Sequence, residues 1–282
     1  RCGVTIYHEM PLQRIHRNKN ERTRVAKRRE TPAYAPYLGK DLPRDSLPGV
    51  SDEFGSVEIH HAGRIDTHTL LTATRIAFRE ADILSETQLA YDELKVETDG
   101  VVWRGEHYER VIFCDGMRVL QNPWFRELQT DPVKGEILEL RFAEALPPGI
   151  LNKGKWLLPT NAHEARFGAT YDRRSFDCSP TAEGKEELLD ALIKLLPDAI
   201  TPEVTGHVAG VRICTQDNQP LIGMHPSEPR LGLFNGFGSK GNSLVPWWAD
   251  AFITALCGEQ TLSPHANLER VWKTPLPNDL SQ

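Results

Sequence analysis

The sequence lacks several features that would assign it at once to a functional class. Its 282 residues include five cysteines, an odd number without a Cys-x-x-Cys pair, which argues against a disulfide framework or a zinc site and favours reduced thiols in a cytoplasmic protein. No apolar run approaches the roughly 20 residues of a membrane-spanning helix, and no signal or transit segment stands out. The sequence therefore predicts neither a membrane protein nor a disulfide-rich secreted one.

A strong excess of one charge is also missing. The formal net charge is −6 and charged residues make up 26% of the chain, which is ordinary for a globular protein and argues against nucleic acid as its main partner. The one basic cluster lies within Arg14–Glu30, but Glu21 and Glu30 interrupt it and no aromatic residues are interleaved. We interpret this cluster as the solvated face of a helix.

The most informative segment is Leu231–Gly241, with the sequence LGLFNGFGSKG. A short apolar strand leads into Gly236, Gly238 and Gly241, and a helical pattern follows over Ser243–Leu256. This order can bind an anion or a dinucleotide. A complete dinucleotide unit also needs a second strand and an acidic residue about 20 residues past the glycines, and neither follows here. The turn therefore either completes a nucleotide site begun elsewhere or only packs a strand against a helix.

The rest of the chain mixes the two kinds of secondary structure. The patterns predict further helices over Lys19–Glu30, Asp66–Glu80 and Thr181–Leu196, with Asp66 and Thr181 as N-caps. They also predict a strand pair within Val4–Ile15, a loop over Thr31–Asp52, hairpins of Val101–Arg104 with Tyr108–Cys114 and of Lys155–Pro159 with Arg166–Thr170, and strands at Ser56–His60, Ile83–Leu89, Gly135–Phe142 and Val208–Ile213. Without strict alternation or repeats, this predicts an α/β or α+β chain of two interleaved lobes.

Four stretches together carry a family resemblance. They are Gly55–Asp66, Tyr108–Gly116, Gly135–Leu140 with Lys155–Asp172, and Ala209–Gly241. In this order and spacing they resemble the D-amino acid oxidase family of FAD-dependent oxidoreductases, which includes glycine and sarcosine oxidases. The resemblance implies FAD as cofactor, a small-molecule amine or amino acid as substrate, and oxidation by hydride transfer to the flavin.

The resemblance also implies how the chain is divided. An incomplete Rossmann-like FAD-binding lobe would consist of residues 59–116 and 205–262. A mixed-sheet substrate lobe would cover residues 117–204. A segment leading into the substrate lobe would occupy residues 1–58, and residues 263–282 would form a C-terminal tail.

Two turns of the FAD-binding lobe are the cofactor-binding candidates that the resemblance implies. Cys114, Asp115 and Gly116 would approach the phosphate and ribose side of FAD. The second turn would place a helix N-terminus beside the flavin pyrimidine through Gly236, Phe237, Gly238, Ser239, Lys240 and Gly241. A helix N-terminus suits the negative charge of the reduced ring, and glycines let backbone N–H groups come close. Lys240 either adds a full charge there or faces solvent.

Two residues are the candidates for the substrate side. The resemblance places a guanidinium at Arg212 that would clamp a substrate carboxylate, since its planar fork matches the two oxygens. A structural salt bridge is the alternative role for Arg212. Trp156 stands where amino-acid-oxidising members often carry a tyrosine, and an indole cannot replace the phenolic oxygen. Trp156 therefore indicates a bulkier or less polar substrate.

The front of the chain departs from the family. No glycine triplet occurs between Arg1 and Asp52, and the chain opens at Arg1 without a methionine. We therefore expect an N-terminally truncated fragment, or a chain without the main cofactor grip, that binds FAD weakly. Two other functions remain open: a non-catalytic scaffold or assembly protein without FAD, and an RNA-modifying enzyme that uses the basic cluster.

Overall fold

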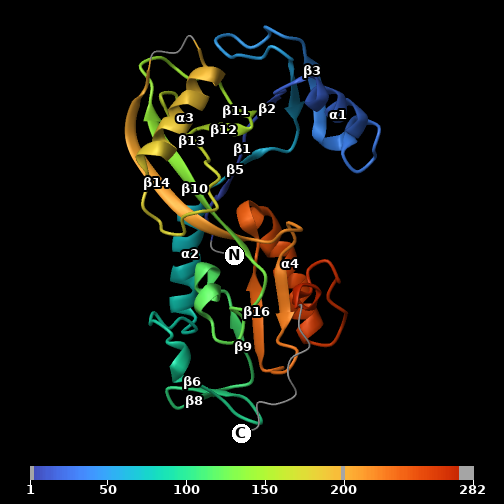
Figure 1. The fold of residues 1–282 in the computed structure, drawn as a ribbon, viewed down its shortest axis with the longest axis vertical. Helices are drawn as coiled ribbons and strands as arrows, with labels where there is room; N and C mark the ends of the chain where they lie inside the picture. Colours follow the sequence, from blue (N-terminus) through green and yellow to red (C-terminus); the bar gives the residue numbers. More distant parts are fainter. Residues whose placement is uncertain (1–2, 198–200, 273–282) are drawn as a thin grey trace. The chain divides into compact units, whose positions relative to one another are not determined.

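The computed structural model describes residues 3–197 and 201–272, and these form two compact units that alternate along the sequence (Figure 1). Unit 1 comprises Arg1–Ser85, Gly135–Tyr171 and Cys178–Gly210, and unit 2 comprises Glu86–Lys134, Asp172–Asp177 and Val211–Gln282. Mixed sheets and helices occur in the chain as expected, so the predicted α/β class is confirmed. Which unit serves the flavin and which the substrate stays a prediction.

The main sheet has eight strands in the order β14-β10-β13-β12-β11-β2-β4-β3. Its strands are β2 (Leu12–Ile15), β3 (Leu38–Leu42), β4 (Ser56–Ile59), β10 (Asp131–Arg141), β11 (Ile150–Lys153), β12 (Lys155–Pro159), β13 (Glu164–Gly168) and β14 (Glu203–Cys214). β11 and β2 are parallel, whereas β12 pairs antiparallel with both β11 and β13. The predicted hairpin of Lys155–Pro159 with Arg166–Thr170 is therefore confirmed.

Helix α3 (Ala182–Leu195) covers one face of this sheet. Leu188, Leu192 and Leu195 of the helix are buried in one cluster with Leu157 and Phe167 of the sheet. Thr181 is the N-cap, as predicted, because its side-chain oxygen accepts a hydrogen bond from the Gly184 N–H. Burial of this apolar helix stripe against alternate strand residues is the main hydrophobic stabilisation of unit 1.

Two more helices belong to unit 1. Helix α1 (Lys19–Arg29) carries the basic cluster, and helix α2 (Thr67–Glu80) begins at the predicted cap Asp66. The expected strand pair within Val4–Ile15 is wrong, although both strands exist. β1 (Tyr7–Glu9) pairs with β5 (Gly63–Ile65), while β2 pairs with β4 and β11, because Met10 and Pro11 separate the two strands into different sheets.

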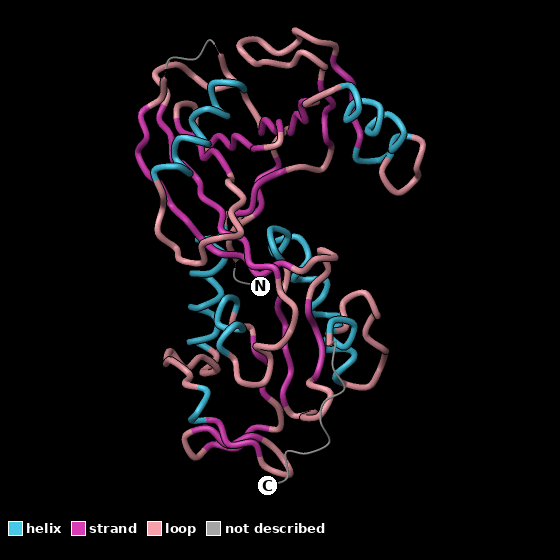
Figure 2. The backbone as a smooth tube through the Cα atoms, viewed as in Figure 1, coloured by secondary structure: helices cyan, strands magenta, loops and turns pink. Residues whose placement is uncertain are grey.

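Unit 2 contains two three-stranded sheets and the last helix. The first sheet has the order β15-β16-β9, formed by Leu221–Met224, Leu231–Asn235 and Val111–Phe113. The second is a meander of β6 (Leu94–Val96), β7 (Val101–Trp103) and β8 (Glu106–Tyr108), drawn as short magenta segments in Figure 2. Helix α4 (Gly241–Leu256) packs Trp248 and Phe252 against Ile222 of β15.

Short 3-10 turns complete the structure at Ala35–Tyr37, Tyr91–Glu93, Gly116–Gln121, Gly238–Lys240 and Leu268–Val271.

Besides the strand pair of Val4–Ile15, three sequence expectations fail. Ile83–Leu89 is not a strand, because this segment pairs with no strand of a described sheet, and Ile83 is 68% exposed. Thr31–Asp52 is not only loop, because it contains β3.

The third failure concerns Tyr108–Cys114, which is not one strand. Arg104 and Gly105 both have positive φ and turn β7 tightly into β8, and the chain then starts the separate strand β9. β9 pairs with β16 in parallel and not with β7. The strand that ends at the Cys114 turn is therefore part of the same sheet as the strand that ends at the glycine-rich turn.

Four described cysteines, at positions 114, 178, 214 and 257, are not in disulfide bonds, and Cys2 lies outside the described residues. The predicted C-terminal tail, residues 263–282, is described only as far as Trp272. Among the helices that the structure describes, none is long and apolar enough to cross a membrane.

Candidate functional site

The two turns predicted to bind the cofactor lie at the same edge of one sheet in unit 2. β9 and β16 run parallel, with Phe113 paired to Leu233, so their carboxyl ends meet. Cys114, Asp115 and Gly116 follow β9, and Gly236 follows β16 directly. The carboxyl edge of parallel strands is where ligands bind in open α/β sheets, so the topology supports a site here.

Asp115 holds these two turns together. One carboxylate oxygen accepts a hydrogen bond from the Asn235 side chain at 3.2 Å, and the other accepts from the Tyr91 hydroxyl at 2.8 Å and from Asn122 at 3.2 Å. The Asn235 amide also donates to the Gly116 carbonyl at 2.9 Å. Since three protein donors engage the carboxylate, its observed role is to fix the two strand ends, and direct contact with a cofactor stays a prediction.

Tyr91 is a hydrogen-bond partner of Asp115 that the sequence did not single out. Burial, followed by the hydrogen bond to the Asp115 carboxylate, raises the pKa of Tyr91 to about 12. The phenol therefore stays protonated and keeps donating to Asp115 across the physiological range. Its sequence position, 24 residues before Asp115, offers no local signal for this contact.

The three glycines of the predicted turn have different reasons to be glycine. Gly236 and Gly238 have φ of +78° and +54°, the left-handed region that glycine adopts without strain. A Cβ at Gly236 would lie 2.9 Å from the Leu221 backbone nitrogen, and one at Gly238 would lie 3.0 Å from the Cys214 sulfur. Gly241 is helical, and among the described residues outside its own helix backbone and chain neighbours, one atom lies within 4 Å of its Cβ position, the Phe237 Cβ at 3.9 Å.

Open space at Gly241 coincides with an uncapped helix start. Helices α1, α2 and α3 each have a side chain that accepts a hydrogen bond from the first turn, whereas α4 has none. The first N–H groups of a helix carry partial positive charge and need acceptors. The N-terminus of α4 can therefore receive an external anion or a polar ring edge.

The other residues of this turn divide between packing and exposure. The Phe237 ring packs against the Phe234 ring with centroids 4.7 Å apart, which anchors the turn on the core under α4. Ser239 and Lys240 are exposed, and in the described part of the chain the Lys240 ammonium has no ion-pair partner. The structure thus keeps both roles open for Lys240.

Arg212 lies on β14 and its side chain is half-buried. Among residues 3–197 and 201–272, no carboxylate or carbonyl forms an ion pair or hydrogen bond with its guanidinium. The alternative that Arg212 is part of a structural salt bridge therefore finds no support in the described residues. A half-buried guanidinium without a protein partner is suited to bind an anionic ligand.

Trp156 belongs to unit 1 and is half-buried on β12. It pairs with Gly168 of β13, and a Cβ at Gly168 would lie 3.3 Å from its ring. Leu157, the next residue, is in the core with α3, so the alternation of a strand puts Trp156 on the opposite face. A glycine beside the indole leaves room for a large side chain on this face.

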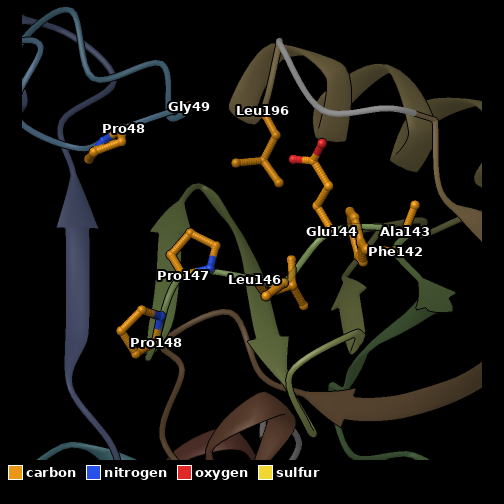
Figure 3. Close-up of a pocket in the computed structure, with 10 residues that line it drawn as sticks. Pro48, Gly49, Phe142, Ala143, Glu144, Leu146, Pro147, Pro148 and Leu196 are labelled. Atoms are coloured by element: carbon orange, nitrogen blue, oxygen red, sulfur yellow. The ribbon is translucent and has the colours of Figure 1, made fainter.

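Unit 1 also contains an apolar hollow that the predicted site residues do not line. It has a volume of about 490 Å³ and lies around the loop between β10 and β11, where Figure 3 shows Pro147, Pro148 and Leu146. Glu144 is its one charged lining residue, and none of the predicted site residues lines it. An apolar hollow with a single polar group lacks the convergent groups typical of a reaction site.

Comparison with known proteins gives a consistent result. The sequence profile described as "FAD dependent oxidoreductase" matches residues 1–253. A glycine oxidase of Pseudomonas putida is 31% identical over 137 residues, which are 48% of this chain and 38% of that protein. A glycine oxidase of Pseudomonas aeruginosa is 27% identical over 205 residues, which are 71% of this chain and 50% of that protein.

Solved structures share the fold of the chain. The crystal structure of glycine oxidase from Geobacillus kaustophilus matches with a TM-score of 0.78 and 21% identity, covering 94% of this chain and 76% of that one. At this identity the match shows a shared fold. The chain spans half or less of the length of the two Pseudomonas enzymes.

Proposed function

Because the chain belongs to the family of FAD-dependent oxidoreductases, we propose that it takes part in the oxidation of a small amine or amino acid. The observation that supports this most directly is Arg212, a half-buried guanidinium without a partner in the described residues. An amino acid offers a carboxylate that matches it. The similarity to glycine oxidases agrees with such a substrate.

The residues at the sheet edge of unit 2 would hold one side of FAD. When bound, the flavin supplies the hydride acceptor for oxidation at the carbon next to the amine. The uncapped start of α4 would donate backbone N–H groups to the polar edge of the ring, and the open position at Gly241 would let that edge approach. Asp115 would hold the two turns in place through Asn235. Gly-x-Gly-x-x-Gly occurs once in the sequence, at this turn.

On the substrate side, Arg212 would orient the carboxylate and Trp156 would shape the pocket for a bulkier or less polar substrate. Under this proposal unit 2 carries the flavin and unit 1 the main sheet of the substrate lobe. The chain would work in the cytoplasm, with no membrane partner and without nucleic acid as its main partner. A non-catalytic scaffold that retains the fold is the competing proposal.

The test is a substitution at Arg212. In the complete enzyme, Arg212→Ala should lower kcat/KM on a carboxylate-bearing amine by an amount equivalent to about 2–5 kcal/mol of transition-state stabilisation, the range for removing one partner of a desolvated charge pair. Arg212→Lys should restore part of the loss, since the charge returns without the fork. Steady-state kinetics on an amine without a carboxylate is the control and should change little.

Two results would count against these proposals. Unchanged kinetics on the carboxylate substrate in both variants would give Arg212 a structural or surface role. This chain by itself is expected to bind FAD weakly, so the second test uses a full-length clone: if that protein stays colourless after reconstitution with FAD and shows no flavin-dependent oxidation, the scaffold is favoured.

A further inference from the structure

A small cavity of about 190 Å³ in unit 1 collects basic side chains from four separate segments. Arg17 comes from the loop before α1, Lys153 from the end of β11, Lys155 from the start of β12, and Lys194 from the last turn of α3. The described lining contains no acidic residue. Cations that meet in one cavity repel each other, so this arrangement is one that an anion would stabilise.

The fold explains why three of these side chains converge. Ile15, Leu151 and Leu157 are core residues on the face of the sheet that α3 covers. Lys153 and Lys155 are each two residues from one of these leucines along a strand, so the pleat directs them to the same face. Arg17 follows Ile15 by two residues at the end of neighbouring β2. The basic groups therefore continue the core face at the point where the apolar residues end.

Gly154 makes the approach possible. It forms the tight turn between Lys153 and Lys155 and has a φ of +85°. A Cβ at this position would lie 3.2 Å from the Cδ atom of Arg17, so the missing side chain lets the arginine lie across the turn. Phe167 and Leu195 form an apolar floor beneath the charged groups. We call the four basic side chains Arg17, Lys153, Lys155 and Lys194 the cationic rim of the cavity, and they lie beside these two buried apolar residues.

The positive charge of the rim is only partly offset by the protein. The Lys153 ammonium donates to the carbonyl and the hydroxyl of Ser51 at 2.6 and 3.1 Å, both neutral acceptors. Burial lowers the pKa of Lys153, although the charges of Glu53 and Asp52 oppose the shift. The Lys155 ammonium donates to the Glu187 carboxylate at 2.7 Å and to the Ala169 carbonyl at 2.9 Å, and neither acceptor belongs to the described lining of the cavity.

Arg17 also keeps donors available. Its Nε atom contacts Glu21 at 3.0 Å, but the same carboxylate serves Arg14 and lies 4.0 Å from Arg24. One carboxylate therefore faces three guanidinium groups and leaves an excess of positive charge beside the cavity. The terminal nitrogens of Arg17 make no hydrogen bond to the rest of the described chain.

We propose that this cavity is an anion site that binds a phosphate group. Several converging ammonium and guanidinium donors suit the multiple oxygens of a tetrahedral oxyanion. The volume is below the roughly 300–1,000 Å³ of pockets that enclose a whole drug-sized ligand. The cavity therefore holds one phosphate group, either free or as the end of a phosphorylated molecule. It is separate from the flavin and substrate residues proposed above and goes beyond that function.

The experiment is a titration of the whole chain with inorganic phosphate, without flavin or amine, followed by ¹H–¹⁵N NMR at constant ionic strength set with chloride. Phosphate should shift the amide signals around Gly154 and Lys194 with saturable behaviour. Lys155→Gln and Lys194→Gln should each weaken binding about tenfold, the size of one charge-assisted contact. Lys185→Gln removes a charge from the exposed start of the same helix, and binding should change by less than about twofold because distant exposed charges are screened.

The spectrum of each variant in the absence of phosphate reports whether the fold is kept. If Lys155→Gln disturbs it, the exposed Lys194→Gln decides. Parallel titrations with ribose 5-phosphate and with a dinucleotide phosphodiester identify the source of the group. Tighter binding of one of them names the source, and equal binding shows that the phosphate alone is recognised. The proposal is overturned if phosphate causes no saturable shift, or if the pocket variants and Lys185→Gln respond alike.

Discussion

The N-terminus of α3 in unit 1 and the N-terminus of α4 in unit 2 solve the same electrostatic problem in opposite ways. At α3 the protein supplies its own acceptors. The buried Glu136 carboxylate accepts hydrogen bonds from the Thr181 backbone at 2.9 Å and hydroxyl at 2.8 Å, and Thr181 caps Gly184. His207 lies 2.8 Å from the same carboxylate. At α4 no side chain in the described part of the chain caps the helix, and a Cβ at Gly241 would meet open space.

The difference separates a structural helix start from one available to a ligand. Partial positive charge at a helix N-terminus is present in both cases, because the peptide dipoles align along each helix. At α3, Thr181 accepts from the Gly184 N–H and is itself held by the buried Glu136 carboxylate, and the helix packs into the core of its unit. Where no acid is provided, the first N–H groups of the helix can bind an outside acceptor, which is the role we propose for α4 toward the flavin.

The largest expected effect comes from removing the internal acid of α3. Glu136→Leu should lower the free energy of unfolding by about 4 kcal/mol, since two charge-assisted hydrogen bonds from the partly buried Thr181 are lost. Urea unfolding followed by circular dichroism measures this. Glu183→Leu, at an exposed position in the first turn, is the control and should change stability far less. Equal stability of Glu136→Leu and the unchanged chain would mean that α3 does not depend on its acid.

A third helix start sharpens the comparison through pH. Glu21 lies in the first turn of α1. Burial alone would raise its pKa, but hydrogen bonds from the Arg17 backbone, the Arg17 side chain and Arg14 outweigh it and lower the pKa from 4.5 to about 2. A depressed folded-state pKa stabilises the fold above the ordinary value. This contribution, on the order of 3 kcal/mol, should be lost as the pH falls from about 4.5 to about 2.

The measurement is the free energy of unfolding at a series of pH values. Glu21→Gln should be less stable than the unchanged chain at neutral pH, and the difference should shrink across that acidic window. If the curves of unfolding free energy against pH were parallel for the two proteins, the ionised Glu21 carboxylate would not stabilise the start of α1 through Arg14 and Arg17.

A capping carboxylate at the start of α4 should raise stability and weaken flavin binding, and the change in stability should be smaller than the loss expected for Glu136→Leu. Lys240 occupies the N-cap position of α4, so Lys240→Asp provides the missing acceptor and a favourable charge. We expect a gain of about 1 kcal/mol in stability together with weaker FAD binding, because the new carboxylate competes for the same N–H groups. Thermal unfolding and flavin fluorescence titration measure the two sides. Lys240→Ala is the control, and a gain in stability with unchanged flavin affinity would separate α4 from the flavin.

The smallest effect is expected at Gly241, where the protein leaves space for a methyl group. Gly241→Ala should raise stability by about 0.5 kcal/mol, because alanine suits a helical φ, and should still weaken flavin binding if the ring lies against this position. Gly238→Ala is the matched contrast, since positive φ and the nearby Cys214 sulfur make it destabilising. Unchanged flavin affinity in Gly241→Ala would leave the turn with a packing role only.

Local patterns in the sequence predicted the elements whose cause is local. Asp66 and Thr181 precede amphipathic runs and cap α2 and α3, because an N-cap needs only neighbouring backbone groups. β16 runs over Leu231–Asn235 as predicted, and the strand, glycine turn and helix follow in the expected order. The resemblance of four stretches also identified the family correctly. The apolar run at Ile83–Leu89 misled because periodicity does not reveal whether a partner strand exists.

The sequence by itself determined the class of fold, the family and the position of the glycine turn, because residue type and spacing control local geometry and carry the family's motifs. Tertiary structure alone decided that β9 and β16 are parallel neighbours and that Tyr91 and Asn235 donate hydrogen bonds to Asp115. It also decided that Arg17, Lys153 and Lys155 line one cavity. These contacts join residues up to about 140 positions apart. Such pairings depend on which strands lie side by side and which faces are buried, and no window of sequence contains that information.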